Sequence, residues 1–339
     1  MTSKQPKVVQ VDKLEIRIQM EEEREELAKV NAEIAIADWS TEEDIINVAK
    51  DADAVLTDAA PITRRVLDSL RECKVVVSYG IGYNHIDVDA ATDNGILVVN
   101  VPDFCLDEVS NHAITMLLVC AKKLMLMHNG TKQGRWTKCK KALAPMGSIK
   151  GQTLGLVGCG KIGRLTAKKA QCFGLTVLGY DPYVDESLVS QYSIKLMSLP
   201  QLLQEADYVS VHAPLSKETY HLIGEKELKM MKPSAYLINT SRGSVIDESA
   251  LIRALQENWI AGAGLDVFER EPVDPGNPLL KMDNVVVSPH SAFYSDAASR
   301  RLKRSVGEEA ARVLSGRWPR NVVNQSVKPK VNLTKENAR

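Results

Sequence analysis

The sequence predicts a parallel α/β fold divided into two domains. Short runs rich in valine, isoleucine and leucine recur along the chain, and segments of helical length separate most of them. These runs are continuously apolar rather than alternating, which is typical of strands that helices cover on both faces. The chain has 339 residues, a length that suits two domains of ordinary size. Together these observations favour two parallel sheets, each flanked by helices.

Five of the apolar runs lie in the first third of the chain and predict the first sheet. In order they are KVVQV at 7–11, AEIAIAD at 32–38, AVLTD at 54–58, KVVVSYG at 74–80 and ILVVNVP at 96–102. Each run is bounded by glycine, proline or polar residues, as strands usually are. We expect this sheet to end at Pro102. A long amphipathic segment at about 106–128 then predicts a helix.

Six further runs follow the GSIKG stretch and predict a second sheet, from roughly Gly151 to Pro289. They are TLGLVG at 153–158, TVLGYD at 176–181, YVSVHAP at 208–214, AYLINTS at 235–241, AGLDVF at 263–268 and VVVSP at 285–289. The last helical stretch, at 296–316, comes after this second sheet is complete. It could pack on either sheet.

The composition gives no support for binding to nucleic acid or to a membrane. Lysine plus arginine and aspartate plus glutamate both number 43, so the formal net charge is zero and no bulk field attracts a polyanion. The six cysteines have neither the pairing of a disulfide framework nor the spacing of metal ligands, so we expect no metal. The amino-terminal stretch lacks the apolar segment of a signal peptide, and Lys122 and Lys123 interrupt the most apolar helical segment. We therefore expect a cytoplasmic protein.

The second predicted sheet begins with a glycine pattern typical of dinucleotide binding. In TLGLVGCGKIGR, an apolar run leads into Gly158, Gly160 and Gly163, spaced as G-x-G-x-x-G, and a helix-forming run follows directly. The first glycine permits a tight turn, the second lets the backbone approach a pyrophosphate, and the third lets the helix pack closely on the strand. The helix N-terminus, at Lys161 and Ile162, then faces the negative charge.

An acidic residue at the end of the next strand favours NAD over NADP. Asp181 closes TVLGYD and lies 18 residues after Gly163. A carboxylate at this place can accept hydrogen bonds from the ribose hydroxyls and would repel a 2′-phosphate. The alternative is an aspartate that only starts the DPY turn. The succession of strand, glycine turn, helix, strand and acid favours the dinucleotide site.

Three polar residues follow strands of this same sheet. Arg242 follows AYLINTS, Glu271 follows AGLDVFER, and His290 follows VVVSP. Because ligands gather beyond the carboxyl ends of parallel strands, we expect these side chains at one edge of the sheet, beside the cofactor. Taken alone, the histidine could be structural and the arginine could lie on the surface. Glu269 is an equally acidic candidate in the same ERE stretch.

The three residue types suit hydride transfer to a 2-keto acid. Arginine stays charged, and its planar fork can bind the substrate carboxylate and polarise the carbonyl. Histidine titrates near physiological pH, so it can donate the proton that the developing alkoxide needs. A neighbouring carboxylate would favour the protonated ring and fix its orientation.

Longer stretches resemble the D-2-hydroxyacid dehydrogenase family, which includes glyoxylate and hydroxypyruvate reductases, phosphoglycerate dehydrogenase and the C-terminal binding proteins. The matching stretches are TLGLVGCGKIGR, VHAPLSKETYHLI, LINTSRGSVIDESAL, AGAGLDVFEREP and VVVSPHSAFYS, with SYGIGYNHIDVDAA and GILVVNVP nearer the start. The resemblance covers nearly all of residues 7–325. The stretch from 288 onward is most similar to the C-terminal binding protein branch, and the YGIGYN loop to the glyoxylate and hydroxypyruvate reductases. The family resemblance implies that Arg242, Glu271 and His290 form the catalytic set, and it therefore selects Glu271 over Glu269.

The resemblance also implies which residues bind the substrate and which bind NAD. Substrate-binding residues are implied at Tyr79, Gly80, Ile81, Gly82 and Phe293. Besides the glycine turn and Asp181, the implied NAD-binding residues are His212, Ala213, Pro214, Thr219, Thr240, Ser241 and Asp266. Of these, Asp266 is expected near the nicotinamide.

The family further implies two Rossmann-like or flavodoxin-like domains with the active site in the cleft between them. Residues 1–105 together with 294–339 would form the substrate domain. Residues 106–293 would form the dinucleotide-binding Rossmann domain. Family members are generally dimers, so we expect a homodimer.

The sequence therefore predicts an NAD-dependent oxidoreductase that transfers a hydride between NADH and a small 2-keto acid to give a D-2-hydroxy acid. A keto acid of the glyoxylate or hydroxypyruvate type is expected. The alternative is an NADH-sensing, dimerising binding protein of the C-terminal binding protein type. The complete catalytic set favours the enzyme.

Overall fold

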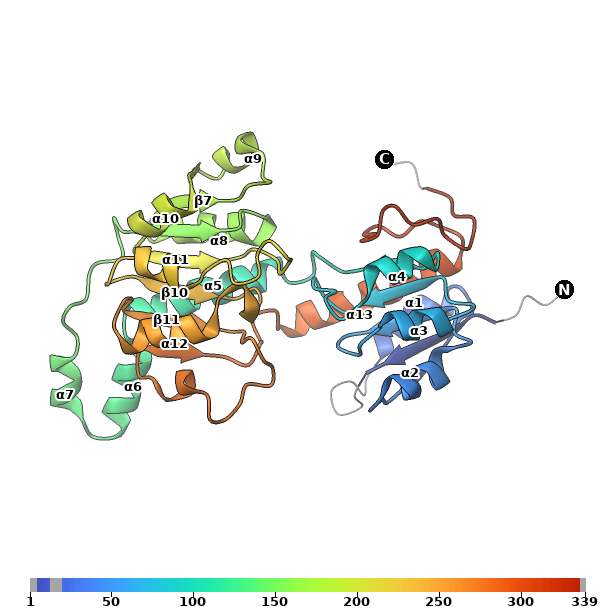
Figure 1. The fold of residues 1–339 in the computed structure, drawn as a ribbon, viewed down its shortest axis with the longest axis horizontal. Helices are drawn as coiled ribbons and strands as arrows, with labels where there is room; N and C mark the ends of the chain where they lie inside the picture. The colour runs from blue at the N-terminus through green and yellow to red at the C-terminus, as the bar shows by residue number, and fades with distance from the viewer. Residues whose placement is uncertain (1–4, 13–19, 336–339) are drawn as a thin grey trace. The chain divides into compact units, whose positions relative to one another are not determined.

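The computed structural model describes residues 5–12 and 20–335, so three parts of the predicted substrate domain, 1–4, 13–19 and 336–339, lie outside the described residues. The chain divides into two compact units (Figure 1). The first unit comprises the residues up to Phe104 and those from Ser295 onward, and the second unit is Cys105–Tyr294. Each unit is built on one parallel sheet, which confirms the predicted fold class.

The sheet of the first unit has five parallel strands in the order β2-β1-β3-β4-β5. This is the flavodoxin-like strand order. The strands are β1 (Lys7–Val11), β2 (Glu33–Ala37), β3 (Ala54–Thr57), β4 (Val75–Ser78) and β5 (Leu97–Val99). All five lie within predicted runs. β3, β4 and β5 are buried along their whole length, as continuously apolar strands should be when helices cover both faces.

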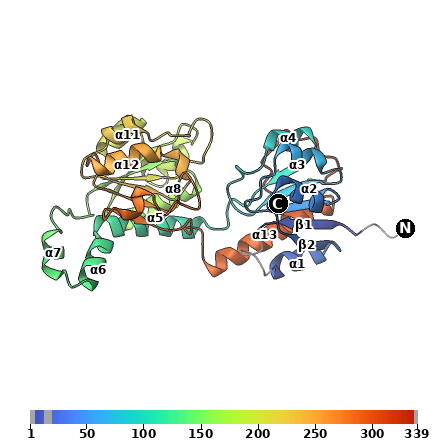
Figure 2. The same cartoon turned by 60° about the horizontal axis from the view of Figure 1, so that its bottom comes forward.

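Four helices connect the strands of the first unit, and a fifth arrives from the end of the chain. They are α1 (Glu21–Ala28), α2 (Glu42–Ala49), α3 (Arg64–Ser69), α4 (Val88–Asp93) and α13 (Asp296–Leu314). Thr41 caps α2 in a capping box, which fixes where that helix begins. α13 packs against α1 and β4, and Figure 2 shows it beside α1. The sequence left open which of the two sheets α13 packs on, and the structure places it on the sheet of the first unit.

The sheet of the second unit has seven parallel strands in the order β12-β11-β10-β9-β6-β7-β8. The strand order reverses at β6, so the ligand crevice expected of such a sheet lies beyond the carboxyl ends of β6 and β9. The strands are β6 (Thr153–Val157), β7 (Thr176–Tyr180), β8 (Ile194–Leu196), β9 (Tyr208–Val211), β10 (Tyr236–Asn239), β11 (Gly262–Leu265) and β12 (Val285–Val287). β8 is absent from the predicted strands. It has three residues at the sheet edge and only Ile194 is buried.

The helices of the second unit flank this sheet. They are α5 (Leu106–Ala121), α6 (Leu124–Lys132), α7 (Trp136–Lys141), α8 (Lys161–Cys172), α9 (Glu186–Ser190), α10 (Leu199–Glu205), α11 (Glu225–Met230) and α12 (Glu248–Gln256), with 3-10 turns at Gly243–Val245 and Pro278–Lys281. α5 packs against α8, β10 and β11. The single helix predicted at about 106–128 is wrong. The chain breaks between α5 and α6 because Lys123 adopts a left-handed backbone with φ of 48°.

Across the described residues, no helix by itself has both the length and the apolar composition that crossing a membrane requires. α5 and α6 satisfy the two criteria only when taken together, across a bend of 62°.

Candidate active site

Glu271 and His290, from the loops after β11 and β12, form a hydrogen-bonded pair. His290 Nδ1 lies 2.6 Å from Glu271 Oε2, and the Phe268 amide donates to Glu271 Oε1 at 2.9 Å. The side chains of His290 and Glu271 are 40% and 36% exposed. Because Nδ1 is engaged by the carboxylate, Nε2 is the ring atom left to meet a ligand. In the described part of the chain, Nε2 has no hydrogen-bond partner.

A buried carboxylate holds the loop that carries His290. Asp266 is 1% exposed, and its Oδ1 accepts from Ser288 Oγ at 2.5 Å and from the Ser291 amide at 2.9 Å. Its Oδ2 accepts from the Ala292 amide at 2.9 Å, and its carbonyl accepts from the His290 amide at 2.7 Å. His290 has φ of 50°, a left-handed conformation that costs on the order of 1–2 kcal/mol in a residue with a side chain. The contacts with Asp266 offset this cost. The expected place of Asp266 beside the nicotinamide stays a prediction.

The loop that carries Arg242 packs directly on the loop that carries Glu271. Asn239, at the end of β10, donates from Nδ2 to the Arg242 carbonyl at 2.9 Å. A Cβ at Gly243 would lie 1.9 Å from the Phe268 carbonyl carbon, so only glycine fits there. The tight approach brings the guanidinium of Arg242 close enough to Glu271 for their charges to interact.

Burial and charge shift the pKa values of this cluster. Burial lowers the pKa of Arg242, and the charge of Glu271 opposes that effect. Burial by itself would raise the pKa of Glu271, but the hydrogen bonds from His290 and the Phe268 amide, with the charges of His290 and Arg242, hold it below its ordinary value. At neutral pH the cluster therefore holds an ionised carboxylate between a histidine ring and a permanent cation.

Glu269, the other acid of the ERE stretch, pairs with a different histidine. His221 Nε2 lies 2.6 Å from Glu269 Oε1, which also accepts from the Glu248 amide at 3.1 Å. Possible ligand atoms of His221, Asp247 and Glu269 all lie within 4.8 Å of one another, close enough to hold a metal ion. However, Asp247 is the N-cap of α12 and Glu269 accepts from the first turn of the same helix. Both carboxylates therefore satisfy a helix N-terminus.

The turn between β6 and α8 has the shape that a pyrophosphate needs. Gly158 has φ of +99°, and a Cβ there would lie 2.6 Å from the Ala213 amide nitrogen. A Cβ at Gly163 would lie 2.4 Å from the Gly158 carbonyl oxygen, whereas one at Gly160 would meet nothing within 4 Å. Gly160 is the N-cap of α8 and provides no side-chain hydrogen bond. The N-terminus of α8 therefore lies at this turn without a side-chain cap, and the open face at Gly160 admits an anion.

Two further predicted residues at the carboxyl edge of this sheet, Asp181 beside the turn and Thr240 after β10, have unused hydrogen-bonding capacity. Asp181 accepts from the Cys159 amide through Oδ2 and from the Tyr183 amide through Oδ1, both at 2.9 Å, so each oxygen keeps a lone pair for a ribose hydroxyl. Thr240 Oγ1 is buried and has no hydrogen-bond partner within the described residues. Since buried polar atoms are nearly always paired, this hydroxyl fits a site that is completed by a bound dinucleotide.

Thr219 and Ser241 use their hydroxyls within their own loops. Thr219 Oγ1 donates to the Pro214 carbonyl at 2.5 Å and accepts from the Ser216 amide at 2.8 Å. Ser241 Oγ donates to Asn239 Oδ1 at 2.9 Å. Both residues shape loops at the carboxyl edge of the sheet, and their contact with NAD stays a prediction.

His212 lies against the glycine turn and is unsuited to proton transfer. Its Nε2 lies 2.9 Å from Ser210 Oγ, and burial lowers its pKa to about 4. His212 is therefore neutral at physiological pH. With Ala213, whose backbone closes on Gly158, it forms part of the wall of the turn.

The depressed pKa of His212 predicts a loss of stability in acid. The unfolded chain binds a proton at this residue below about pH 6.5, while the folded chain does not until about pH 4. The unfolded state thus binds more protons between these values, and stability falls as the pH falls. This one group should lower the free energy of unfolding at pH 5 by about 2 kcal/mol relative to pH 7.5.

Urea unfolding at pH 7.5 and pH 5 measures this effect. His212→Gln should lose less unfolding free energy between the two pH values than the native protein, by the amount given above. His128→Gln, at an exposed position, should lose as much as the native protein. Equal losses in His212→Gln and the native protein would contradict a neutral buried ring.

The predicted substrate loop Tyr79–Gly82 belongs to the first unit, and Phe293 belongs to the second. Tyr79 is buried, and its hydroxyl donates to Glu23 at 2.9 Å. The carbonyls of Gly80, Ile81 and Gly82 are all bonded inside the first unit, to the Val101 amide, Asn100 Nδ2 and Ser78 Oγ respectively. The ring of Phe293 lies 6.5 Å from that of His290, centroid to centroid. Substrate binding by these residues, and the cleft expected between the domains, stay predictions.

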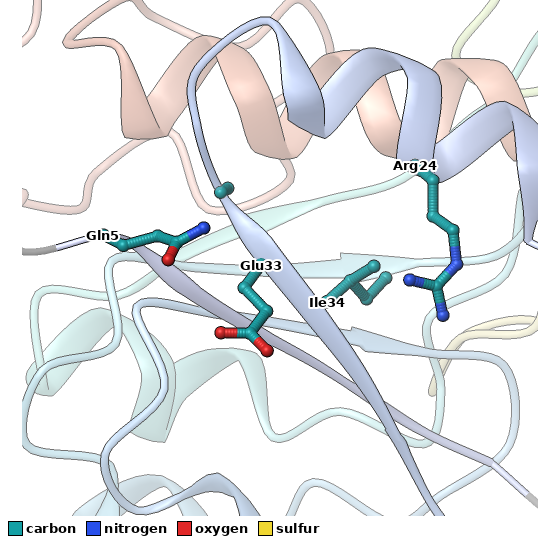
Figure 3. A pocket seen from close by; sticks show the side chains of 5 residues that line it. Gln5, Arg24, Glu33 and Ile34 are labelled. Atoms are coloured by element: carbon teal, nitrogen blue, oxygen red, sulfur yellow. The ribbon is translucent and has the colours of Figure 1, made fainter.

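Two hollows on the described surface of the first unit contain none of the predicted site residues. One of about 470 Å³ is lined by Gln5, Arg24, Ala32, Glu33 and Ile34 (Figure 3). Another, of about 460 Å³, is lined by Asn100, Trp318, Arg320, Asn321, Val322, Gln325 and Lys335. Neither lining includes a histidine, a cysteine or a serine. The groups suited to catalysis are those at the carboxyl edge of the second sheet.

The sheet is doubly wound, with a glycine turn after β6 and an acid after β7, and an arginine, a glutamate and a histidine follow β10, β11 and β12. Together these features define an NAD-dependent oxidoreductase. Residues 114–292 match the family model of the D-isomer specific 2-hydroxyacid dehydrogenase, NAD binding domain. The chain belongs to this family, as the sequence predicts.

Relatives with known names agree with this assignment. A glyoxylate reductase of Korarchaeum cryptofilum is 41% identical over 84% of this chain and 86% of its own length. The structure of D-lactate dehydrogenase from Aquifex aeolicus, complexed with NAD and lactic acid, is similar with a TM-score of 0.81 and 28% identity, over 94% of this chain and 99% of that one. The NADPH-dependent glyoxylate/hydroxypyruvate reductase of Sinorhizobium meliloti has a TM-score of 0.84 and 28% identity, over 97% of this chain and all (100%) of that one.

Proposed function

We propose that Arg242, Glu271 and His290 together reduce a small 2-keto acid, of the glyoxylate or hydroxypyruvate type, to the D-2-hydroxy acid. The observation that carries the proposal is the 2.6 Å contact between His290 Nδ1 and Glu271 Oε2, which leaves Nε2 unbonded at a half-exposed ring. NADH, when bound at the turn after β6, supplies the hydride for the carbonyl carbon.

Each side chain has one task in this reaction. His290 Nε2 donates its proton to the carbonyl oxygen as negative charge develops there, and then takes a proton from solvent. Glu271 fixes the orientation of the ring through its contact with Nδ1. Arg242 binds the substrate carboxylate and polarises the carbonyl, which lowers the energy of the oxyanion that forms.

A panel of keto acids tests this function. The purified protein is mixed with NADH and, in turn, glyoxylate, hydroxypyruvate, pyruvate and longer or aromatic 2-keto acids, and NADH absorbance is followed. We expect oxidation of NADH with at least one small keto acid. Absence of oxidation with every compound would contradict the proposal.

The same assay run with NADPH tests the role of Asp181. We expect kcat/KM to be about 10- to 100-fold lower with NADPH than with NADH, which corresponds to roughly 1.4–2.8 kcal/mol. The reason is that the Asp181 carboxylate, fixed by two backbone amides, would face the 2′-phosphate. Asp181→Ser should narrow the difference. Equal efficiency of both cofactors in the native protein would show that this acid does not read the ribose.

The alternative function, an NADH-sensing binding protein of the C-terminal binding protein type, is not favoured. The named relatives are reductases and dehydrogenases, and the hydrogen-bonded Glu271–His290 pair has no task in a protein that only senses the cofactor. A sensor would bind NADH and leave every keto acid of the panel unreduced.

We further propose that the protein is a cytoplasmic homodimer. Large apolar side chains on and around α6 and α7 support an association through this part of the second unit, since exposed apolar clusters commonly mark interfaces. They are Leu124, Met125, Trp136 and Leu143, at 52%, 41%, 62% and 37% exposed. Light scattering should give twice the chain mass of 37.4 kDa.

A further inference from the structure

A fourth histidine, His112, is connected by hydrogen bonds to the loop that carries His290. His112 lies on α5, and its Nε2 lies 2.9 Å from Ser288 Oγ, which is 176 residues away in sequence. The same nitrogen lies 3.6 Å from Asp266 Oδ1. Ser288 is two residues before His290, and its carbonyl also accepts from the His290 amide at 3.1 Å. α5 is thereby connected to the loop that holds the proton donor.

The direction of these hydrogen bonds follows from the hydroxyl in the middle. Ser288 Oγ lies 2.5 Å from Asp266 Oδ1, and an ionised carboxylate can only accept, so the single hydroxyl proton points to Asp266. Ser288 Oγ must then accept from His112. His112 Nε2 therefore carries a proton and donates it, so the chain of donors runs from His112 through Ser288 to Asp266.

These linked hydrogen bonds affect the position of His290 because Asp266 holds the loop that carries it. Asp266 is buried. Its carboxylate accepts hydrogen bonds from Ser288 Oγ and from the Ser291 and Ala292 amides, all in the segment that includes the left-handed His290. A hydroxyl that had lost its donor from α5 could rotate away from Asp266. The loop would then lose one of the contacts that hold the ring of His290 against Glu271.

We propose that His112 is a positioning residue for the reaction, acting through Ser288 and Asp266 on the loop that carries His290. The inference rests on the proposed function, since it concerns the efficiency of the same proton donor. His112 does not touch substrate in this account. The positioning role needs only an N–H donor at the place that Nε2 of His112 occupies.

Three variants separate this role from a general effect on packing. His112→Ala should lower kcat about tenfold. This is less than the loss of rate, on the order of 10²-fold, that a displacement of 1 Å at a reacting group causes, because the loop keeps its other contacts with Asp266. His112→Gln keeps an N–H donor and should recover most of the loss. Thr115→Ala, one turn further along α5 and exposed, should match the native protein. NADH affinity should stay within about twofold in all three, because none of the substituted residues is among those expected to bind NAD and Asp266 itself is retained.

A double-mutant cycle provides the decisive comparison. Ser288→Ala removes the hydroxyl through which His112 acts, so adding His112→Ala to Ser288→Ala should lower kcat no further. The inference is overturned if His112→Ala retains native kcat, if His112→Gln is as impaired as His112→Ala, or if the two substitutions have independent, multiplicative effects. A lower melting temperature with unchanged kcat would likewise assign His112 to stability alone.

Failure of this inference is distinct from failure of the proposed function. If the native protein reduces no keto acid, the proposed function is wrong. If the native protein is active and the His112 variants equal it, the reduction stands and only the positioning role is lost.

Discussion

His290→Gln is expected to lower kcat about 10²- to 10⁴-fold, the usual contribution of a general acid. The side-chain amide of glutamine can still donate a hydrogen bond to Glu271, but it has no proton to give up at physiological pH. NADH affinity should remain close to native because His290 is not among the residues expected to bind NAD. Turnover is measured with the keto acid that the panel identifies, and NADH affinity by fluorescence titration.

The matched control for this variant is His221→Gln. His221 contacts Glu269 at the same 2.6 Å, and its side chain is 31% exposed, against 40% for His290. The two pairs differ in that Glu271 also interacts with the charge of Arg242. His221→Gln should therefore keep kcat within about twofold, since it removes no group from the reaction. Equal losses in the two variants, or a loss of NADH binding in His290→Gln, would identify His290 as a structural residue.

Arg242→Gln is the second substitution with a large expected effect. It removes the charged, two-pronged contact with the substrate carboxylate and the charge that polarises the carbonyl. Loss of about 3–5 kcal/mol of transition-state stabilisation is expected, a decrease of roughly 10²- to 10⁴-fold in kcat/KM. Arg242→Lys keeps the charge without the fork and should fall between the native protein and Arg242→Gln.

Arg270→Gln is the control for charge, because Arg270 is exposed and lies between the two glutamates of the ERE stretch. It should keep kcat/KM close to native. A comparable loss in Arg270→Gln would mean that Arg242 acts by general electrostatic attraction of the anion. A native kcat/KM in Arg242→Gln would remove it from the site.

The parts of this protein that the sequence predicts well are those controlled by strand ends and glycine geometry. Apolar runs predicted eleven of the twelve strands found within residues 5–12 and 20–335, because a strand buried on both faces needs continuous apolar character. The turn at Gly158 was predictable because its left-handed backbone and the close approach of Ala213 tolerate no side chain. Arg242, Glu271 and His290 could be assigned to one edge because parallel strands deliver their following loops to the same side.

Other features depend on contacts that leave no local pattern. β8 has only Ile194 buried, so its three residues resemble a polar loop. The break between α5 and α6 lies in a run whose composition suits one helix, and the left-handed turn at Lys123 decides it. The contact between His112 and Ser288 joins residues 176 positions apart. Spacing could not assign Glu269 and Glu271 to their separate histidines either, and only the family resemblance chose between them.

The stereochemistry of oxidation tests the central claim most directly. The native protein is given NAD⁺ with the separate D and L isomers of small 2-hydroxy acids, such as lactate and glycerate, and NADH formation is followed. A site in which His290, Arg242 and the cofactor hold the substrate in one orientation should produce NADH from D isomers and not from L isomers. NADH formation from L isomers, or from both at similar rates, would contradict the account.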